Sequence, residues 1–334
     1  MCSSDLTEGR DILFLSADRS SELPYEVIEW NPGGTSSFWV LLPSLDQETS
    51  IYIKWGNPST TSRPTYTSDG TVWKNHTSVW RMDGDSQYKV EDHASGFHAT
   101  AKNSDHQSVK GVIGNALFLD GVDDFLQLPV ASYFGTEESS LNLSFWSLNQ
   151  YKQLANYSLF HAHSSLGTHF LVQLPSAEGN IKLFTGSGSL DSISYDYSIN
   201  TDISVWNYWV LQADLNSGLS RIYLNGNLAT EYFGTSRPFG YSVDSFRLGA
   251  QRDGSESWVG LVDEVRMSAQ IETAPKIAAS YANQKPDSTG FITFGSVSGP
   301  PIILSSEKLQ AFVDKDFSST IERYPQDEGN FTAV

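Results

Sequence analysis

The residues most able to do chemistry in this sequence are carboxylates gathered in one short turn. Asp120, Asp123 and Asp124 fall within five residues, between the apolar run 116–119 and the alternating segment 125–128. Three carboxylates this close repel one another, so the turn is favourable only when water or a cation surrounds it. Calcium takes six to eight oxygen ligands from carboxylates, backbone carbonyls and water. The turn is therefore a candidate calcium site.

The same aspartates also suit a turn without a metal. In Asp-Gly turns the aspartate side chain commonly accepts a hydrogen bond from its own backbone. In this interpretation Asp263 or Glu264 forms an ordinary salt bridge, and its partner is Arg247 or Arg266. The residues alone leave both interpretations open. A calcium site predicts that a chelator lowers the melting temperature, whereas turn chemistry predicts no shift.

The acidic turn is positioned by predicted β-strands. An Asp/Gly cluster between two apolar runs is typical of two strands joined by a tight turn. Asn225-Gly226 is a second, strong hairpin signal because both residues accept a positive φ. The only predicted helix is 273–284, with Thr273 as N-cap and Pro275 in its first turn. Further strands are expected near 141–147, 156–161, 168–174, 180–185, 207–213, 219–224, 244–249 and 260–267.

The segment 111–128 is similar to the motif G-x-x-G-x-A-L-x-F-D-G-x-x-D-Y-V. Five further segments follow it, NLSFW at 142–146, VWNYWV at 205–210, RIYLNG at 221–226, FRLG at 246–249 and GLVDEVR at 260–266. In this order the six segments resemble the laminin G-like modules of the concanavalin A-like lectin/glucanase superfamily, in which the first motif opens the sandwich. The resemblance implies an all-β fold, a jelly-roll β-sandwich over 78–284.

The same resemblance enlarges the candidate calcium site. Residues 91–100 are similar to a family loop, D-S-S-G-N-G-H-x-G-T, with Asp92 and Gly96 in place. The family folds this loop beside the acidic turn, and the strand that starts near Asp263 runs close to the first strand. In many relatives a structural calcium ion lies among the equivalent positions. The resemblance thus implies a ligand set of Asp92, Asp120, Asp123, Asp124 and Asp263.

No arrangement of acids or nucleophiles predicts an enzyme. Retaining glucanases of this superfamily place two glutamates on one face of a strand as E-x-D-x-E or E-x-D-x-x-E, and neither string occurs. There is no G-x-S-x-G for a serine hydrolase. His161 and His163 alternate on one face of a predicted strand, but nothing in the sequence identifies the third ligand that zinc requires. We predict a protein without catalytic activity.

Sugar recognition depends on exposed aromatic rings that stack on pyranose faces, with polar groups directed at the hydroxyls. Trp206, Tyr208 and Trp209 alternate in one strand, and we expect most of them in the core. Better surface candidates lie in segments rich in Gly, Ser and Asp. These candidates are Tyr195, Tyr197, Tyr232, Phe239, Tyr241 and Trp258.

The composition limits the class of partner. The chain has 334 residues, of which 13% are aromatic, and this composition is typical of a folded protein. Its net charge of −18 disfavours nucleic acid and anionic membranes as partners. Its one cysteine, Cys2, cannot form an internal disulfide. No apolar run approaches the roughly 20 residues of a membrane helix. The first residues lack the features of a signal peptide, and we expect the chain to be a fragment of a longer secreted protein.

Two further segments flank the predicted sandwich. Residues 1–77 are expected to form a small β-sandwich domain, truncated at its start, which resembles an uncharacterised bacterial surface domain. Its most distinctive signature is Trp55-Gly-Asn-Pro58. Residues 285–300 have the composition of a linker. Residues 301–334 resemble the opening of a bacterial immunoglobulin-like (Ig-like) repeat and are too few to close a core of their own.

These features predict a non-catalytic carbohydrate-binding or adhesion module of a secreted or cell-surface bacterial protein. The expected partner is a glycan, a surface polysaccharide or a glycoprotein, with calcium as a structural ion. We expect no membrane insertion and a monomer within a longer multidomain chain. The first alternative is a purely structural β-spacer without a specific ligand. The second is an enzyme related to glycoside hydrolases.

Overall fold

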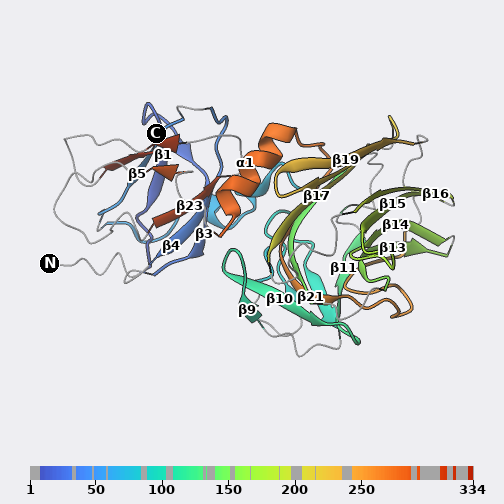
Figure 1. The fold of residues 1–334 in the computed structure, drawn as a ribbon. Coiled ribbons are helices and arrows are strands. Elements are labelled where there is room, and N and C mark those ends of the chain that lie inside the picture. The colour runs from blue at the N-terminus through green and yellow to red at the C-terminus, as the bar shows by residue number, and fades with distance from the viewer. Residues whose placement is uncertain are drawn as a thin grey trace. The chain divides into compact units, whose positions relative to one another are not determined.

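The computed structural model divides the chain into two units, 1–72 with 275–334, and 73–274. Both are built of strands (Figure 1). The residues that the structure describes are 8–31, 35–46, 49–57, 59–83, 89–102, 108–130, 133, 140–150, 155–165, 167–187, 189–196, 205–214, 216–234, 243–286, 292–293, 309–313, 319–320 and 330–333.

The described part of the first unit contains three small sheets. One has the strand order β2-β1-β5-β25, where β25 is Asn330–Ala333, another has the order β23-β4-β3, where β23 is Leu309–Val313, and the third is a C-terminal pair of short strands. Phe14, Tyr25 and Phe38 pack ring against ring at the centre, where all three are fully buried. The Tyr25 hydroxyl donates a hydrogen bond to the Ile12 carbonyl at 2.6 Å. The strands are β1 (Leu13–Ser16), β2 (Glu22–Leu23), β3 (Tyr25–Glu29), β4 (Ser36–Val40) and β5 (Ile51–Lys54), followed by the 3-10 turns η2 (Thr65–Thr67) and η3 (Thr71–Trp73).

The C-terminal strands join the sheets of this first unit. β23 (Leu309–Val313) pairs in parallel with β4, and β25 (Asn330–Ala333) pairs antiparallel with β5. The short strands β22 (Ile292–Thr293) and β24 (Ser319–Thr320) pair with each other. An Ig-like repeat in the C-terminal segment is therefore not confirmed.

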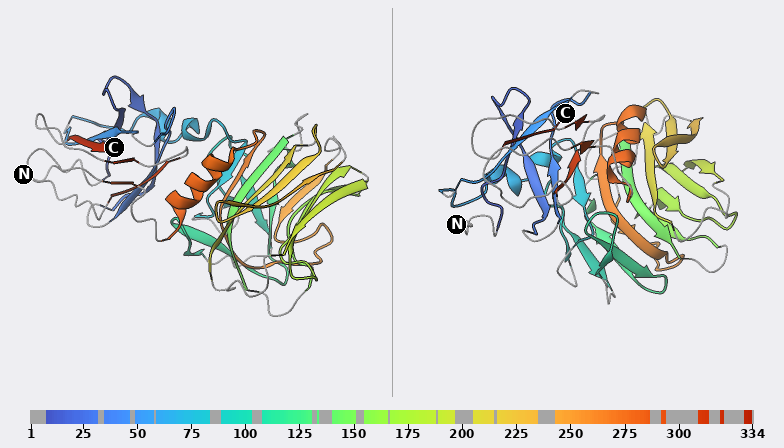
Figure 2. Two further views of the ribbon diagram at one scale, coloured as in Figure 1. Left: turned by 45° about the horizontal axis from the view of Figure 1, so that its top comes forward. Right: turned by 60° about the vertical axis from the view of Figure 1, so that its left-hand side comes forward.

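The second unit is an antiparallel sandwich of two eight-stranded sheets, which Figure 2 shows from two further sides. The first sheet has the order β19-β18-β17-β12-β21-β10-β9, with β6 also pairing β21. Its strands are β6 (Ser78–Trp80), β9 (Ser108–Lys110), β10 (Asn115–Asp120), β12 (Ser140–Asn149), β17 (Asn207–Asp214), β18 (Leu219–Leu224), β19 (Asn227–Phe233) and β21 (Val259–Ser268). The prediction of an all-β jelly-roll sandwich is confirmed.

The second sheet has the order β16-β15-β14-β13-β20-β11-β8-β7. Alternate residues of both sheets point inward, and Phe145 of the first sheet meets Phe160 of the second with ring centroids 5.2 Å apart. Trp209 is fully buried, as the sequence predicted. The strands are β7 (Lys89–Val90), β8 (Ala99–Lys102), β11 (Phe125–Leu128), β13 (Ser158–Ser164), β14 (Gly167–Gln173), β15 (Ile181–Ser187), β16 (Ser189–Tyr195) and β20 (Ser245–Leu248).

The predicted local elements are also present. Asn225 and Gly226 adopt φ angles of 50° and 83° and join β18 to β19. The helix α1 spans Ala274–Gln284, one residue shorter than the predicted 273–284. Within the described residues, no helix has the length and apolar character needed to span a bilayer.

Candidate functional site

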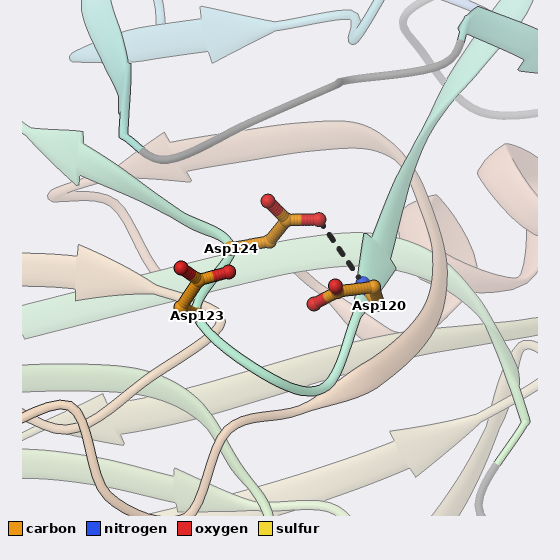
Figure 3. Close-up of side chains that lie close together, drawn as sticks. All are labelled: Asp120, Asp123 and Asp124. Carbon is orange, nitrogen blue, oxygen red and sulfur yellow. Dashed lines mark hydrogen bonds between the residues drawn. The ribbon is translucent and has the colours of Figure 1, made fainter.

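The acidic turn crosses from one sheet to the other. β10 ends at Asp120 in the first sheet, and β11 begins at Phe125 in the second. Asp120, Asp123 and Asp124 each offer a carboxylate oxygen within 4.8 Å of the others. Figure 3 shows the three side chains around this turn. Asp124 is buried, whereas Asp120 and Asp123 are exposed. Among the described residues, no other group of three or more His, Cys, Asp or Glu side chains lies close enough together to hold one metal ion.

Backbone hydrogen bonds hold the same turn. Asp120 Oδ1 accepts a bond from the Val122 N–H at 2.8 Å, and Asp124 Oδ2 accepts one from the Asp120 N–H at 3.2 Å (Figure 3). Gly121 has φ 75°, and a Cβ there would lie 2.7 Å from Val259 Cβ, so only glycine fits. The turn chemistry expected of an Asp-Gly sequence is thus present, and three carboxylates still converge within reach of one cation.

Asp92 lies away from this turn. Asp92 forms a β-bridge with Trp80, and Trp80 pairs with Val265 in the second half of β21. Asp120 pairs instead with Val259, the first residue of β21. The Asp92 carboxylate accepts four backbone N–H bonds, between 2.7 and 3.2 Å long, from Val79, Ala94, Ser95 and Phe97. The structure therefore does not bring Asp92 into the candidate calcium site, because its oxygens hold a loop in place.

Asp263 is likewise outside the acidic turn. It is fully buried, and its Oδ2 accepts backbone N–H bonds from Val112 at 2.7 Å and Ile113 at 3.1 Å. A Cβ at Gly111 would lie 2.4 Å from that oxygen, so the loop closes over the carboxylate only with glycine there. Burial raises the pKa of Asp263 well above its usual value, and the neighbouring Glu264 raises it further. The Asp263 side chain therefore holds the loop at 111–113 in place and is not part of the acidic turn.

The predicted salt bridge involves the next residue along β21. Glu264 is buried, and its Oε2 lies 2.7 Å from Arg266 Nη2. Burial raises the pKa of Glu264, while Arg266 and Arg81 oppose that rise. The Arg266 alternative from the sequence is therefore confirmed for Glu264.

The histidine pair is held by hydrogen bonds on both rings. His161 Nδ1 accepts the Arg252 N–H at 3.1 Å, and its Nε2 lies 3.1 Å from Thr168 Oγ1. His163 Nδ1 lies 3.0 Å from Arg252 Nη1. Burial, followed by the charge of His163, lowers the pKa of His161 to about 4. Both His161 nitrogens are engaged, so this pair is not arranged to bind zinc.

The candidate sugar-binding aromatics differ sharply in exposure. Trp258 is only 1% exposed, and its Nε1 donates a bond to the Leu174 carbonyl at 2.6 Å, so the prediction that it lies at the surface is wrong. Its ring belongs to the core, whereas residues 252–255 of the same loop are exposed. Tyr195 packs partly buried against the core, and Tyr232 on β19 is 45% exposed. Tyr197, Phe239 and Tyr241 lie outside the described residues.

Sequence analysis missed two residues beside Tyr232. A Cβ placed on Gly234 would lie 2.7 Å from Asp191 Oδ2 and 2.9 Å from Tyr232 Cε1. The carboxylate and the ring therefore both lie against the Gly234 backbone and leave no room for a side chain there. Asp191 belongs to β16 of the other sheet, so only the packing of β16 against β19 brings it there. No local sequence signal could have identified it.

Two antiparallel sheets with an acidic turn at the rim define a lectin-like jelly roll. Residues 120–278 match the family model of the concanavalin A-like lectin/glucanases superfamily, of the laminin G type. Residues 8–81 match a domain of unknown function, DUF2341. The resemblances seen in the sequence are confirmed for both segments.

Solved structures share the fold at low sequence identity. Domain 4 of AbnA, a GH43 extracellular arabinanase from Geobacillus stearothermophilus, was solved with arabinotriose; it is 19% identical with a TM-score of 0.50, over 61% of this chain and 97% of that domain. The ligand-binding domain of botulinum neurotoxin serotype D, with N-acetylneuraminic acid, is 13% identical with a TM-score of 0.50, over 63% of this chain and 51% of that one. The match thus spans about half of the toxin domain. No curated protein matches the chain.

Proposed function

We propose that the sandwich of residues 73–274 is a non-catalytic carbohydrate-binding module of a secreted or cell-surface bacterial protein. The observation that carries this proposal is an exposed aromatic ring, Tyr232, beside the Asp191 carboxylate on a concanavalin A-like sandwich. Rings and carboxylates are the groups that recognise the faces and hydroxyls of sugars. Two structural neighbours of the same fold, the arabinanase domain and the toxin domain, were solved with saccharides.

The acids of the sandwich support binding rather than cleavage. A retaining glycosidase needs two carboxyl groups about 5 Å apart on either side of a bound sugar. Asp263 and Glu264 share a strand, but both are buried and engaged with protein groups. Neither can reach a glycan at the surface.

Binding of the whole chain to a glycan panel tests the proposal. The panel includes arabino-oligosaccharides, neutral hexose oligosaccharides and sialylated glycans, each with and without calcium. We expect saturable binding to at least one class and no release of reducing ends. Absence of binding across the panel would overturn the proposal and favour a rigid β-spacer. Release of reducing ends would restore the enzymatic alternative.

We also propose that the acidic turn binds one calcium ion that stiffens the rim. Three carboxylates, one of them buried, converge within 4.8 Å at the crossing between the sheets. These are hard oxygen donors of the kind that calcium prefers. A cation there offsets the mutual repulsion of the three charges. Asp120, Asp123 and Asp124 would supply protein ligands, and water would complete the shell.

Thermal unfolding with calcium or with a chelator tests this second proposal. A ligand present at about 100 times its dissociation constant stabilises the folded state by about 2.7 kcal/mol, so calcium should raise the melting temperature of the sandwich. Asp123→Asn should abolish the shift, because it removes one of the three carboxylates. The Asp123 side chain is exposed, so the substitution should change the stability of the calcium-free protein little. Asp69→Asn, an exposed aspartate outside the turn, is the matched control and should keep the shift. Equal melting temperatures for the wild type in calcium and chelator would overturn the site.

A further inference from the structure

The strand β19 has an edge without the usual protection against pairing with another chain. It ends the first sheet, and among the described strands it pairs only with β18 (Figure 1). Edge strands are normally protected by short length, lysine, proline or an inward-facing charge. The edges β7 and β9 are two and three residues long and contain Lys89 and Lys110, and β16 carries Asp191. β19 is seven residues long and contains neither lysine nor proline.

Apolar side chains gather on this strand. Six large hydrophobic side chains of the described residues are exposed, and three of them, Leu228, Tyr232 and Phe233, lie on β19. The one charged residue of the strand, Glu231, forms an ion pair with Arg221 of β18, with an N–O distance of 3.2 Å. Its charge is therefore offset within the sheet. An exposed strand of this composition favours contact with another apolar surface.

The ladder between β18 and β19 shows which backbone groups face the free edge. The Gly234 N–H donates a hydrogen bond to the Gly218 carbonyl at 2.8 Å. Along an antiparallel pair, residues bonded to the neighbouring strand alternate with residues that are not. The one register shift lies nearer the start of β19, so its second half is regular. Tyr232 thus bonds to β18, whereas the N–H and C=O groups of Glu231 and Phe233 point to the free edge.

We propose that this edge of β19 pairs antiparallel with β19 of a second copy of the chain, with Tyr232 opposite Tyr232. In this register Glu231 of each copy lies opposite Phe233 of the other. The backbone groups that face the free edge then bond to one another. A register centred on Glu231 would instead set two carboxylates directly opposite each other, which is destabilising. Charge therefore selects the register that is centred on Tyr232.

The pairing continues the first sheet from one copy into the other and preserves its two faces. Thr230 pairs with Ile222, which is fully buried in the core. Tyr232 lies two residues from Thr230 and so shares its inner face. Across the dimer axis the two Tyr232 residues form a pair without mutual backbone bonds, in which side chains approach closely and aromatic rings pack well. Phe233 and Glu231 meet on the outer face.

A dimer of this kind differs from the monomer that we expected from the sequence. It does not depend on the proposed carbohydrate-binding function, because a chain that binds no glycan can still pair through β19. The two proposals meet at Tyr232, since a glycan stacked on this ring and a second copy exclude each other. A glycan that binds there should therefore convert dimers into monomers.

Sedimentation of the whole chain from micromolar to millimolar concentration tests the dimer. We expect a reversible equilibrium between monomer and dimer. Phe233→Glu places a carboxylate opposite Glu231 of the other copy and should weaken the dimer about tenfold or more. Phe233→Lys is the matched control, because it removes the same exposed ring but places a positive charge opposite Glu231. It should weaken the dimer less than Phe233→Glu does.

Cross-linking tests the register directly. In the chain with Cys2→Ser, which has no other cysteine, Tyr232→Cys places two thiols at the dimer axis. Their Cα atoms lie about 4.5 Å apart, within the range that a disulfide spans. Oxidised glutathione should therefore link the two copies. Leu228→Cys is the control on the same strand, because its two copies lie about 27 Å apart in this register and should not be linked.

Each outcome decides for or against the dimer. A monomer at every concentration overturns it. Equal weakening by Phe233→Glu and Phe233→Lys, or equal cross-linking of Tyr232→Cys and Leu228→Cys, overturns the register. A dimer that persists while a glycan saturates the chain leaves the pairing of β19 standing and places the sugar contact away from Tyr232.

Discussion

At the scale of single residues, the aspartates show what the sequence reveals and what it hides. The acidic turn was predictable, because its carboxylates, its glycine and the flanking strands are all local in sequence. The role of Asp263 was not, since its hydrogen-bond donors are Val112 and Ile113, about 150 residues away. Asp191 and Tyr232 meet only because two sheets pack together. Distant partners of this kind leave no pattern along the chain.

Asp263→Asn should make stability depend less on pH. The pKa of Asp263 is raised in the folded state by burial and then by Glu264, so the stability this group contributes is present at low pH and is lost as pH rises toward the folded pKa. The loss begins near the unfolded pKa of about 3.9 and amounts to about 1.4 kcal/mol per pH unit for one proton. The asparagine carbonyl can still accept the bonds from Val112 and Ile113.

Chemical unfolding of both proteins from pH 4 upward checks this prediction. The stability of the variant relative to the wild type should grow with pH. Glu231→Gln, an exposed pair partner of Arg221, is the control and should show no such trend. A constant difference between Asp263→Asn and the wild type would mean that the carboxylate is ionised throughout.

At the scale of elements, local signals predicted structure well and burial poorly. The Asn225-Gly226 hairpin and the helix predicted at 273–284 each have a local sequence signal, and the structure contains the hairpin and a helix over Ala274–Gln284. Trp258 stands in a segment rich in Ser, Gly and Glu that looks like an exposed loop. Its indole is nevertheless buried, because the Trp258 side chain points into the core and donates a hydrogen bond to the Leu174 carbonyl, while residues 252–255 of the same loop stay exposed. Loop composition carries no information about that direction.

Gly226→Ala should destabilise the sandwich by about 1 to 2 kcal/mol. Gly226 has φ 83°, a left-handed conformation that costs an alanine about that much. Gly226→Asn should cost less, because asparagine adopts this conformation more readily. Urea unfolding of the three proteins checks the order. Equal stability of the alanine variant and the wild type would show that the hairpin relaxes freely.

At the scale of the whole molecule, the described residues form two separate hydrophobic cores. One surrounds Phe14 in the first unit and the other surrounds Phe160 in the sandwich, and no residue belongs to both. The order of the small β-domain and the sandwich was predictable, because each segment has its own motifs. The pairing of β23 with β4 was not predictable, since nothing local links 309–313 to 36–40.

Two cores should give two unfolding transitions in calorimetry. Phe14→Ala should lower one transition and Phe160→Ala the other, because each removes a fully buried ring at a cost of about 3 to 5 kcal/mol. The two variants serve as controls for each other. A single transition that both variants lower together would show that the units unfold as one.

The connection 121–124 between β10 and β11 is short, and Ser257 Oγ donates a hydrogen bond to the Val122 carbonyl at 3.0 Å, which ties it to the neighbouring connection 249–258. β10 and β11 are each paired on both sides, whereas β16 and β19 end their sheets and are paired on one side only. The amide hydrogens of β16 and β19 should therefore exchange with solvent before those of β10 and β11.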